Sequence, residues 1–456
     1  MTTIKLDPGA ALLLDALHGA GHAAYAVGGC VRDSLLGLAP HDWDLCTSAR
    51  PEQVMALFGE EKCIPTGLQH GTVTVKQGGR FYETTTFRTE GAYSDGRHPD
   101  AVCFVPDVRE DLARRDFTIN AMAYSAEEGL IDPFGGRDDL AAHLVRAVGE
   151  PERRFEEDAL RILRLYRFAA RFGFAIDPAT GAAARALGPH LDCVSAERIQ
   201  EELLKLLAAP RPGSYLEPAV LAVVLPELEP EKQPERFAEL CRTIDRIEPT
   251  AENVPTRLAA LLCPLGEAGA RKALRKLKCS NALTDEVTAL VGGSVGSFLL
   301  PRSRDRRAGS SSEDRPLGWD PAAAGSRAGD GMARFASEEE APGTPGSDQT
   351  LMAKRLLGRY ELPTIQRLTA LCSARHPEQA EAFAALRAEA EQLTAENACC
   401  RVSQLAVNGR DLMAAGVRPG PGLRQVLNAL LEAVITGQTP NEKDALLAAA
   451  TQFSAS

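Results

Sequence analysis

The feature that most constrains the fold is one stretch near the N-terminus, AYAVGGCVRDSLLGLAPHDWD. Its first four residues, 24–27, form an apolar run that predicts a buried strand, and Gly28-Gly29 follows where the backbone must turn tightly. Residues 30–36 then predict a helix. A glycine turn that leads into a helix N-terminus presents unpaired N–H groups and the positive end of the helix dipole, which suits a triphosphate. Gly29 and Arg32 are therefore candidate phosphate-binding residues.

Two aspartates follow this helix. Asp42-Trp43-Asp44 predicts the start of a second strand, in which the two aspartates point to one face and Trp43 points to the other. Their Cα atoms would then lie roughly 7 Å apart. Carboxylates at this spacing can share a hard cation such as Mg²⁺, so we expect Asp42 and Asp44 to be catalytic residues and metal ligands. Taken alone, a Gly-Gly pair is most often a turn, and an Asp-x-Asp is usually a solvated strand end.

The order Gly-Gly-x-Val-Arg-Asp, Leu-Leu-Gly, Asp-x-Asp resembles the nucleotidyltransferases of the DNA polymerase β type. Within them it is most similar to the class II tRNA nucleotidyltransferase (CCA-adding) and bacterial poly(A) polymerase branch. The resemblance implies an α+β fold, with a mixed-sheet head followed by an all-α neck, body and tail. It also implies Mg²⁺ as cofactor, and tRNA, CTP and ATP as partners. Such sites often take a third carboxylate from a neighbouring strand. Residues 71–76 and 80–87 predict two strands of a hairpin joined by Gly78-Gly79. Glu83, at the centre of the second strand, is the candidate, and a solvated cross-strand partner is the alternative.

The segment 111–124 (DLARRDFTINAMAY) matches the second motif of this family. Arg115 supplies a cationic fork near phosphates, and Asp116 can accept a hydrogen bond from a ribose hydroxyl. The resemblance assigns Arg115 to the nucleotide and Asp116 to ribose recognition. Apolar residues at helical spacing predict a helix beginning near Thr118. The alternative for the whole segment is a capped helix with an exposed basic start.

A fourth motif, EDALRILRLYRFAARFGF, has apolar residues at helical spacing and places Asp158, Arg161, Arg164 and Arg167 three residues apart. Asp158 and Arg161 on one face could form an ion pair of little energetic worth. They could instead recognise a base edge, since Asp accepts from the amine that C and A share and Arg donates to the adjacent ring acceptor. The resemblance implies the second role and assigns Arg164 and Arg167 to the nucleotide. On a straight helix, each step of three residues falls short of a full turn by about 60°. After three such steps, Arg167 should lie on the side of the helix opposite Asp158.

The length of 456 residues predicts several folded units. The resemblance implies a catalytic head at residues 1–145, a base-recognising neck at 146–210 and a helical body at 211–300. A helical tail that binds tRNA follows at 351–456. Residues 301–350 are crowded with Ser, Gly, Pro, Arg and Asp, which predicts a disordered insertion.

The net charge of -11 means that any nucleic-acid surface must be a local patch. One dense basic run, RKALRKLK, is a candidate for binding tRNA phosphates, and a solvated helix face is the alternative. Its candidate residues are Arg271, Lys272, Arg275 and Lys276.

Eleven cysteines are scattered without CxxC pairs or zinc-ligand spacing, which argues against a disulfide framework and a structural zinc site. No apolar run reaches the roughly 18 residues of a membrane span, and the N-terminus lacks a signal-peptide pattern. We therefore expect a cytoplasmic protein that does not bind membranes. No protein partner is implied, and the oligomeric state stays open.

The sequence thus predicts a template-independent enzyme that adds C, C and A to the tRNA 3′ end and releases pyrophosphate by two-metal nucleotidyl transfer. The polar segment 88–111 keeps the length that the resemblance links to complete CCA addition. A poly(A) polymerase or an A-only tRNA nucleotidyltransferase is the alternative. A non-catalytic RNA-binding protein is the alternative of a different class, and Asp42 and Asp44 argue against it.

Overall fold

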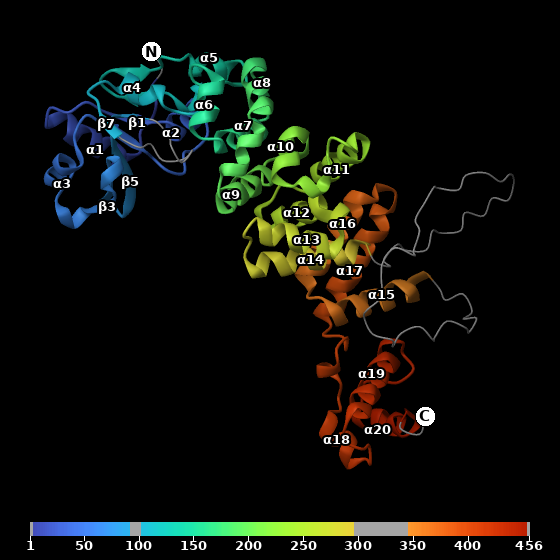
Figure 1. Ribbon diagram of the computed structural model, residues 1–456. Coiled ribbons are helices and arrows are strands. Elements are labelled where there is room, and N and C mark those ends of the chain that lie inside the picture. Colours follow the sequence, from blue (N-terminus) through green and yellow to red (C-terminus); the bar gives the residue numbers. More distant parts are fainter. Residues whose placement is uncertain (1–2, 92–101, 296–344, 454–456) are drawn as a thin grey trace. The chain divides into compact units, whose positions relative to one another are not determined.

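The computed structural model describes residues 3–91, 102–295 and 345–453 (Figure 1). The chain divides into two compact units, Met1–Val295 and Gly296–Ser456. Of the predicted disordered insertion, residues 301–344 lie outside the described residues. Its last residues belong to a helix, so the predicted end of the insertion is too late.

A seven-stranded sheet forms the centre of the head, in the order β3-β4-β5-β2-β1-β8-β9. Neighbouring strands are antiparallel except β2 and β5, which are parallel. The sheet is therefore mixed, as predicted. The strands are β1 (Ala24–Val27), β2 (Leu45–Thr47), β3 (Cys63–Gly67), β4 (Thr72–Gln77), β5 (Arg80–Thr86), β8 (Ala123–Ser125) and β9 (Gly129–Ile131). A separate ladder joins β6 (Arg88–Glu90) to β7 (Val102–Phe104).

The hairpin of β4 and β5 is a local feature that the sequence predicts correctly. Gly78 and Gly79 join the two strands with φ angles of 58° and 82°. Two successive residues with positive φ form the turn whose twist matches that of the paired strands, and glycine adopts it without strain.

Five α-helices accompany the sheet in the described part of the head: α1 (Pro8–Gly19), α2 (Gly29–Leu35), α3 (Pro51–Phe58), α4 (Val108–Ala113) and α5 (Gly136–Ala141). Helix α1 packs on β1 and α3 packs on β4. One cluster of buried side chains joins β1, β2 and α4, with Tyr25, Cys46, Phe87 and Leu112 among its members.

The helix predicted to begin near Thr118 is wrong. Residues Thr118–Asn120 form a single 3₁₀ turn, and the chain then enters β8, which pairs with β1. Phe117, Ile119 and Met122 are all fully buried. Because the segment crosses the core, apolar side chains are buried on every side of it and their spacing carries no helical meaning.

The rest of the first unit is almost entirely helical, which confirms the predicted fold class. Its helices are α6 (Pro151–Glu157), α7 (Leu160–Phe172), α8 (Pro178–Ala186), α9 (Ala196–Leu207), α10 (Pro218–Val224), α11 (Pro234–Arg246), α12 (Val254–Leu262), α13 (Gly266–Lys276) and α14 (Asn281–Val295). A short parallel ladder joins β10 (Leu144–Val145) to β11 (Ala175–Ile176). Helix α7 packs on α9. Arg257, which is fully buried, donates to the carbonyls of Leu207, Ala209 and Ile247 and thereby ties the ends of α9 and α11 together.

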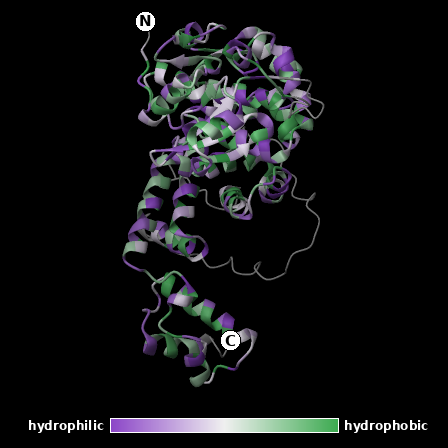
Figure 2. Cartoon of the chain, turned by 90° about the vertical axis from the view of Figure 1, so that its left-hand side faces the viewer, coloured by the Kyte–Doolittle hydropathy of each residue, from purple (hydrophilic) through white to green (hydrophobic). Residues whose placement is uncertain are grey.

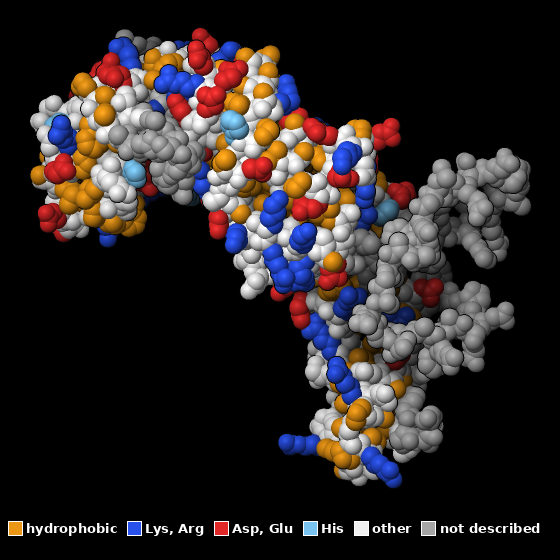
Figure 3. All heavy atoms as spheres, in the orientation of Figure 1, with side chains coloured by type: hydrophobic (Ala, Val, Ile, Leu, Met, Phe, Trp, Pro, Cys, Tyr) orange, Lys and Arg blue, Asp and Glu red, His pale blue; other side chains and the backbone are white. Residues whose placement is uncertain are grey.

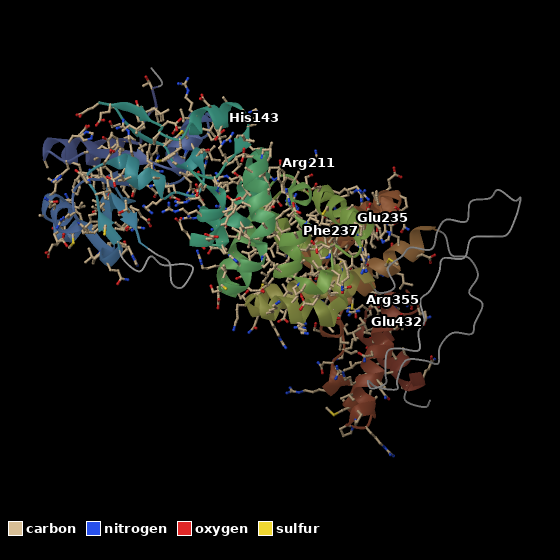
Figure 4. The ribbon with its side chains drawn as sticks, turned by 45° about the horizontal axis from the view of Figure 1, so that its top comes forward. His143, Arg211, Glu235, Phe237, Arg355 and Glu432 are labelled. Carbon is tan, nitrogen blue, oxygen red and sulfur yellow. The ribbon has the colours of Figure 1, made fainter. Side chains whose placement is uncertain are left out.

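The second unit is also helical, and polar and apolar residues recur along its helices, as in amphipathic helices (Figure 2). Its helices are α15 (Pro345–Arg359), α16 (Leu362–Arg375), α17 (Ala380–Ala395), α18 (Gly409–Ala414), α19 (Pro421–Ile435) and α20 (Lys443–Phe453). Helices α18 to α20 enclose a small core that includes Leu412, Leu430 and Leu446. Arg355 of α15 pairs with Glu432 of α19 at 2.5 Å (Figure 4). Among the helices of the described residues, none has the length and apolar character of a membrane span.

Candidate active site

The turn after β1 shows why its first position is glycine. Gly28 has φ 76° and ψ -121°, and a Cβ atom there would stand 2.8 Å from Nη1 of Arg115. A side chain would therefore be strained and would collide with this guanidinium. Gly29 is the first residue of α2, one position earlier than predicted. The turn thus places the Arg115 guanidinium against the start of α2, where the backbone N–H groups are unpaired.

The two aspartates lie just before β2 rather than inside it. The strand begins at Leu45, so the predicted start at Asp42 is wrong, because the ladder with β1 extends only to the carbonyl of Asp44, which accepts from Val27 N–H at 2.9 Å. The predicted alternation holds. Trp43 is buried, whereas Asp42 and Asp44 are exposed.

The register of the sheet brings Glu83 next to Asp44. Leu45 of β2 pairs with Thr84 of β5 in parallel register, so the residues that precede them, Asp44 and Glu83, are neighbours on one face. Although Asp44 keeps an exposed edge, partial loss of water raises the pKa of its carboxyl, and the charges of Glu83 and Asp42 raise it further. Arg115 opposes these effects, and the resulting pKa is about 6. Like charges gathered in this way favour the binding of a cation.

The carboxylates near Asp44 are the candidate ligands for a metal ion. In residues 3–91, 102–295 and 345–453, no three His, Cys, Asp or Glu side chains converge closely enough to hold a metal ion. The Asp42 side chain is 81% exposed and contacts His41 at 3.0 Å, so packing does not fix its rotamer. Hard carboxylate oxygens with one raised pKa nevertheless suit a divalent cation.

Arg32 is buried rather than open to a ligand. Its side chain donates to Asp33 at 2.8 Å and to Asn120 at 2.5 Å. Its Nη2 atom lies 3.6 Å from the position that a Cβ atom on Gly29 would occupy. Arg32 therefore adds positive charge beneath the start of α2. Burial lowers its pKa, and the charge of Asp33 opposes this change.

Both carboxylate oxygens of Asp116 are already occupied. Oδ2 accepts from Nε and Nη2 of Arg164 at 2.9 and 2.6 Å, and Oδ1 accepts from Asn120 at 3.0 Å. Burial by itself would raise the pKa of Asp116, but Arg164 and Asn120 outweigh it and hold this pKa at about 2. Asp116 therefore orients Arg164 here, and its predicted ribose contact would have to be made in addition.

The predicted pairing of Asp158 with Arg161 on one helix face is wrong. Helix α7 begins at Leu160, and Asp158 has extended backbone angles of φ -148° and ψ 103°. Asp158 accepts instead from Arg198 of α9 at 2.8 and 3.3 Å. Arg161 donates to Glu157 at 2.7 Å and to two backbone carbonyls at 3.1 Å. The helical spacing argument fails because the chain is not helical at Asp158.

Arg164 and Arg167 meet at one carboxylate. Glu202 of α9 is 4% exposed, and its oxygens lie 2.6 Å from Nε of Arg167 and 3.9 Å from Nη1 of Arg164. Burial lowers the pKa of Arg167 to about 10, while Glu202 opposes this shift. The expected separation of Arg167 from Asp158 around the helix does not apply, since Asp158 precedes the helix.

The ring of Phe168 lies at the centre of these arginines. The guanidinium carbons of Arg32, Arg164 and Arg167 lie 5.3, 5.3 and 4.1 Å from its centroid. A cation over an aromatic face is attracted by the ring quadrupole. We call the set Arg32, Asp116, Arg164, Arg167, Phe168 and Glu202 the arginine cluster.

Four supporting residues were missed from the sequence: Asn120, Phe168, Arg198 and Glu202. One of them had a signal. Glu202 lies three residues after Ile199 and four before Leu206, on the stripe that α9 buries. A charge on a buried stripe requires a partner, so this pattern could have indicated an ion pair with α7.

The predicted basic run is only partly available to a ligand. Arg271 donates to Asp285 and to Thr288, both at 2.8 Å. Lys272, Arg275 and Lys276 are exposed on α13, where Figure 3 shows Lys and Arg side chains together.

Parts of the chain match models of known families. Residues 24–146 match the poly A polymerase head domain, 173–232 the probable RNA and SrmB-binding site of polymerase A, and 357–450 the tRNA nucleotidyltransferase domain 2. The CCA-adding enzyme of Limosilactobacillus fermentum is 34% identical over 450 residues, 97% of this chain and 96% of its own. That of Lacticaseibacillus paracasei is 36% identical over 446 residues, 97% and 95% of the two chains.

The chain belongs to the CCA-adding enzyme family. It is thus a nucleotidyltransferase, and enzymes of this family generally use a divalent metal ion. The fold agrees with this membership. The CCA-adding enzyme of Bacillus stearothermophilus in complex with CTP has a TM-score of 0.71 at 30% identity, with 98% of both chains covered. A Thermotoga maritima CCA-adding enzyme complexed with tRNA shares the fold, with a TM-score of 0.63 at 20% identity and 98% and 96% coverage. The family predicted from the sequence is confirmed.

Proposed function

We propose that this member of the CCA-adding family adds C, C and A to the 3′ end of tRNA from CTP and ATP without a nucleic-acid template. Pyrophosphate leaves in each step. The observation that carries the proposal is the adjacency of Asp44 and Glu83, with Arg115 acting on Asp44 and lying against the turn at Gly28. Carboxylates beside a cationic helix start fit a nucleotide triphosphate and its metal ions.

The roles in the head follow from this adjacency. Asp42 and Asp44, with Glu83 as third ligand, would hold Mg²⁺. When bound, Mg²⁺ activates the tRNA 3′-hydroxyl and neutralises charge on the phosphates. The Gly29 N–H and Arg115 would bind the triphosphate, and Arg32 would support them from beneath.

The roles in α7 concern the choice of base. Asp158 would accept from the amine that C and A share, and Arg161 would donate to the neighbouring ring acceptor. Asp158 is held by Arg198, but a carboxylate has about four lone-pair sites and can accept from a base as well. Arg164 and Arg167 would contact the nucleotide from the arginine cluster, and Asp116 would accept from the ribose while it orients Arg164.

The remaining proposals concern tRNA and location. Lys272, Arg275 and Lys276, with Arg271 partly neutralised, would contact tRNA phosphates. We keep the predicted division into head, neck, body and tRNA-binding tail as a functional one. All eleven cysteines are free thiols, which suits a reducing compartment such as the cytoplasm.

The test uses the full chain, Mg²⁺ and tRNA that lacks its CCA end. CTP alone should extend the tRNA by two nucleotides, ATP alone should add nothing, and both together should complete CCA. Long runs of A would indicate a poly(A) polymerase. Addition only to tRNA that already ends in CC would indicate an A-only enzyme. No incorporation under any condition would overturn the proposal, and the Asp15→Asn variant, altered at an exposed position on α1, serves as a positive control.

A further inference from the structure

The face of the sheet that carries Glu83 continues away from the carboxylates. Phe81 lies two residues before Glu83 on β5, so it projects from the same face, roughly 7 Å away at the Cα atoms. On β4, Lys76 pairs with Phe81 and Thr74 pairs with Glu83. On β3, Ile64 pairs with Thr74. These residues of β3, β4 and β5 form what we call the open face.

The two faces of these strands differ sharply in burial. On the opposite face Val73, Val75 and Tyr82 are at most 2% exposed, and α3 packs on β4. On the open face Phe81 is 59% exposed and Ile64 is 45% exposed, while Thr74 on the strand between them is 8% exposed. Figure 3 shows hydrophobic side chains gathered over β3 and β5. An aromatic ring exposed to this extent beside catalytic groups contributes little to the core and is available to a ligand.

We propose that Phe81 is a stacking platform for an unpaired base near the 3′ end of the RNA substrate. The inference rests on the proposed function, which brings the 3′-hydroxyl to Asp44 and Glu83. Unpaired bases stack on exposed aromatic rings, and this contact tolerates any base, as a 3′ end that changes with each addition requires. Phosphates passing Glu83 would be repelled, and Lys76 beside Phe81 offsets that repulsion.

The edge of the sheet argues against a second copy of this chain as the occupant. Strand β3 is an edge strand of the sheet, and Pro65 lies in its middle. Proline cannot donate to a strand ladder, so pairing of another strand at this edge is disfavoured. Thr66 of β3 and Thr74 of β4 hydrogen-bond to each other at 2.9 Å, so these two hydroxyls already satisfy each other.

The test places 2-aminopurine, whose fluorescence is quenched by stacking, as the last base of tRNA that lacks CCA. Wild type and Phe81→Trp should quench it. Phe81→Ala should lose the quenching and raise the KM for tRNA about tenfold, with the KM for CTP unchanged. Leu12→Ala, at a position on α1 that is 57% exposed, is the matched control and should behave as wild type. Lys76→Ala should reduce the slope of log affinity for tRNA against log salt concentration by about one, and Phe81→Ala should leave this slope unchanged.

Two results would overturn the platform. One is normal quenching and a normal KM for tRNA in Phe81→Ala. The other is a change in oligomeric state in Phe81→Ala with unchanged RNA binding, which would assign the face to contacts between copies of the chain. If wild type adds no nucleotide, the proposed function fails. If wild type adds C, C and A and Phe81→Ala does so equally well, only the platform fails.

Discussion

The carboxylates of the head and the arginine cluster lie in the same unit but have opposite electrostatics. Asp44 stands beside Glu83 and Asp42, and its pKa is raised to about 6. Asp116 stands beside Arg164, and its pKa is lowered to about 2. The first group gathers like charges without a cationic partner of equal number, whereas the second neutralises its charges within the chain. Under the proposed function, the difference separates the carboxylates that a metal ion would neutralise from a part of the site that is preorganised without one.

The largest expected effect comes from removing the charge of Asp44 in the carboxylate group. Asp44→Asn should lower kcat by at least about 10³-fold, because a metal ligand contributes several kcal/mol to stabilisation of the transition state. Single-turnover incorporation of CTP into tRNA measures it. Asp15→Asn on α1 is the control and should retain full activity. If Asp44→Asn kept more than about a tenth of the activity, Asp44 would not be at the reacting centre.

A smaller effect is expected from removing Asp116 from the arginine cluster. Asp116→Ala leaves the charge of Arg164 without its main partner and should lower the free energy of unfolding by about 3 kcal/mol, the low end for a buried pair, since the Arg164 side chain is 33% exposed. Urea unfolding measures it. Asp42→Ala, at an exposed carboxylate of the other group, should change stability by no more than about 0.5 kcal/mol. Equal losses in both variants would remove the contrast.

The pH dependence of stability sharpens the contrast because the two signs differ. The folded-state pKa of Asp44, about 6, lies above the usual aspartate value of 3.8, so its stabilising contribution is complete below about pH 4 and is lost as the pH rises through 6. The folded-state pKa of Asp116, about 2, lies below the usual value of 3.8. The contribution of Asp116 to stability is therefore present above about pH 4 and is lost as the pH falls through 2.

Without metal, Asp44→Asn should therefore gain stability relative to wild type between about pH 4 and 7. We expect about 1 kcal/mol, reduced by solvent because Asp44 is exposed. For Asp116→Asn, the deficit relative to wild type should shrink below about pH 4. Urea unfolding in EDTA from about pH 2 to pH 7 measures both. The same sign of slope in both variants would contradict the comparison.

The smallest effect concerns the link between α7 and α9. Arg198→Lys keeps the charge but loses the two-pronged contact with Asp158, so the carboxylate proposed to select the base is held less firmly. The preference for CTP over UTP should fall about threefold while kcat stays unchanged. The kcat/KM values for the two nucleotides measure it. Arg185→Lys on α8, whose guanidinium is 3.7 Å from Glu217, is the control. An unchanged preference would mean that Arg198 does not position Asp158.

Local signals in the sequence predicted the elements that depend on a few neighbouring residues. The strand at 24–27, the turn at Gly28 and the hairpin at Gly78-Gly79 follow from apolar runs and from backbone angles that glycine adopts freely. The same rules failed where packing overrides local preference. Residues near Thr118 have helical spacing but cross the core, and Asp158 continues a helical pattern but lies before the helix.

By itself, the sequence determined the family, the glycine turn and the alternation that exposes Asp42 and Asp44 around a buried Trp43. These properties depend on residues within one or two turns of chain. Only the tertiary structure decided which side chains complete the site. Glu83 reaches Asp44 through the register of β2 on β5, and Glu202 reaches Arg164 and Arg167 through the packing of α9 on α7. A residue's electrostatic environment depends on neighbours in space, and the fold brings those neighbours from distant positions in the chain.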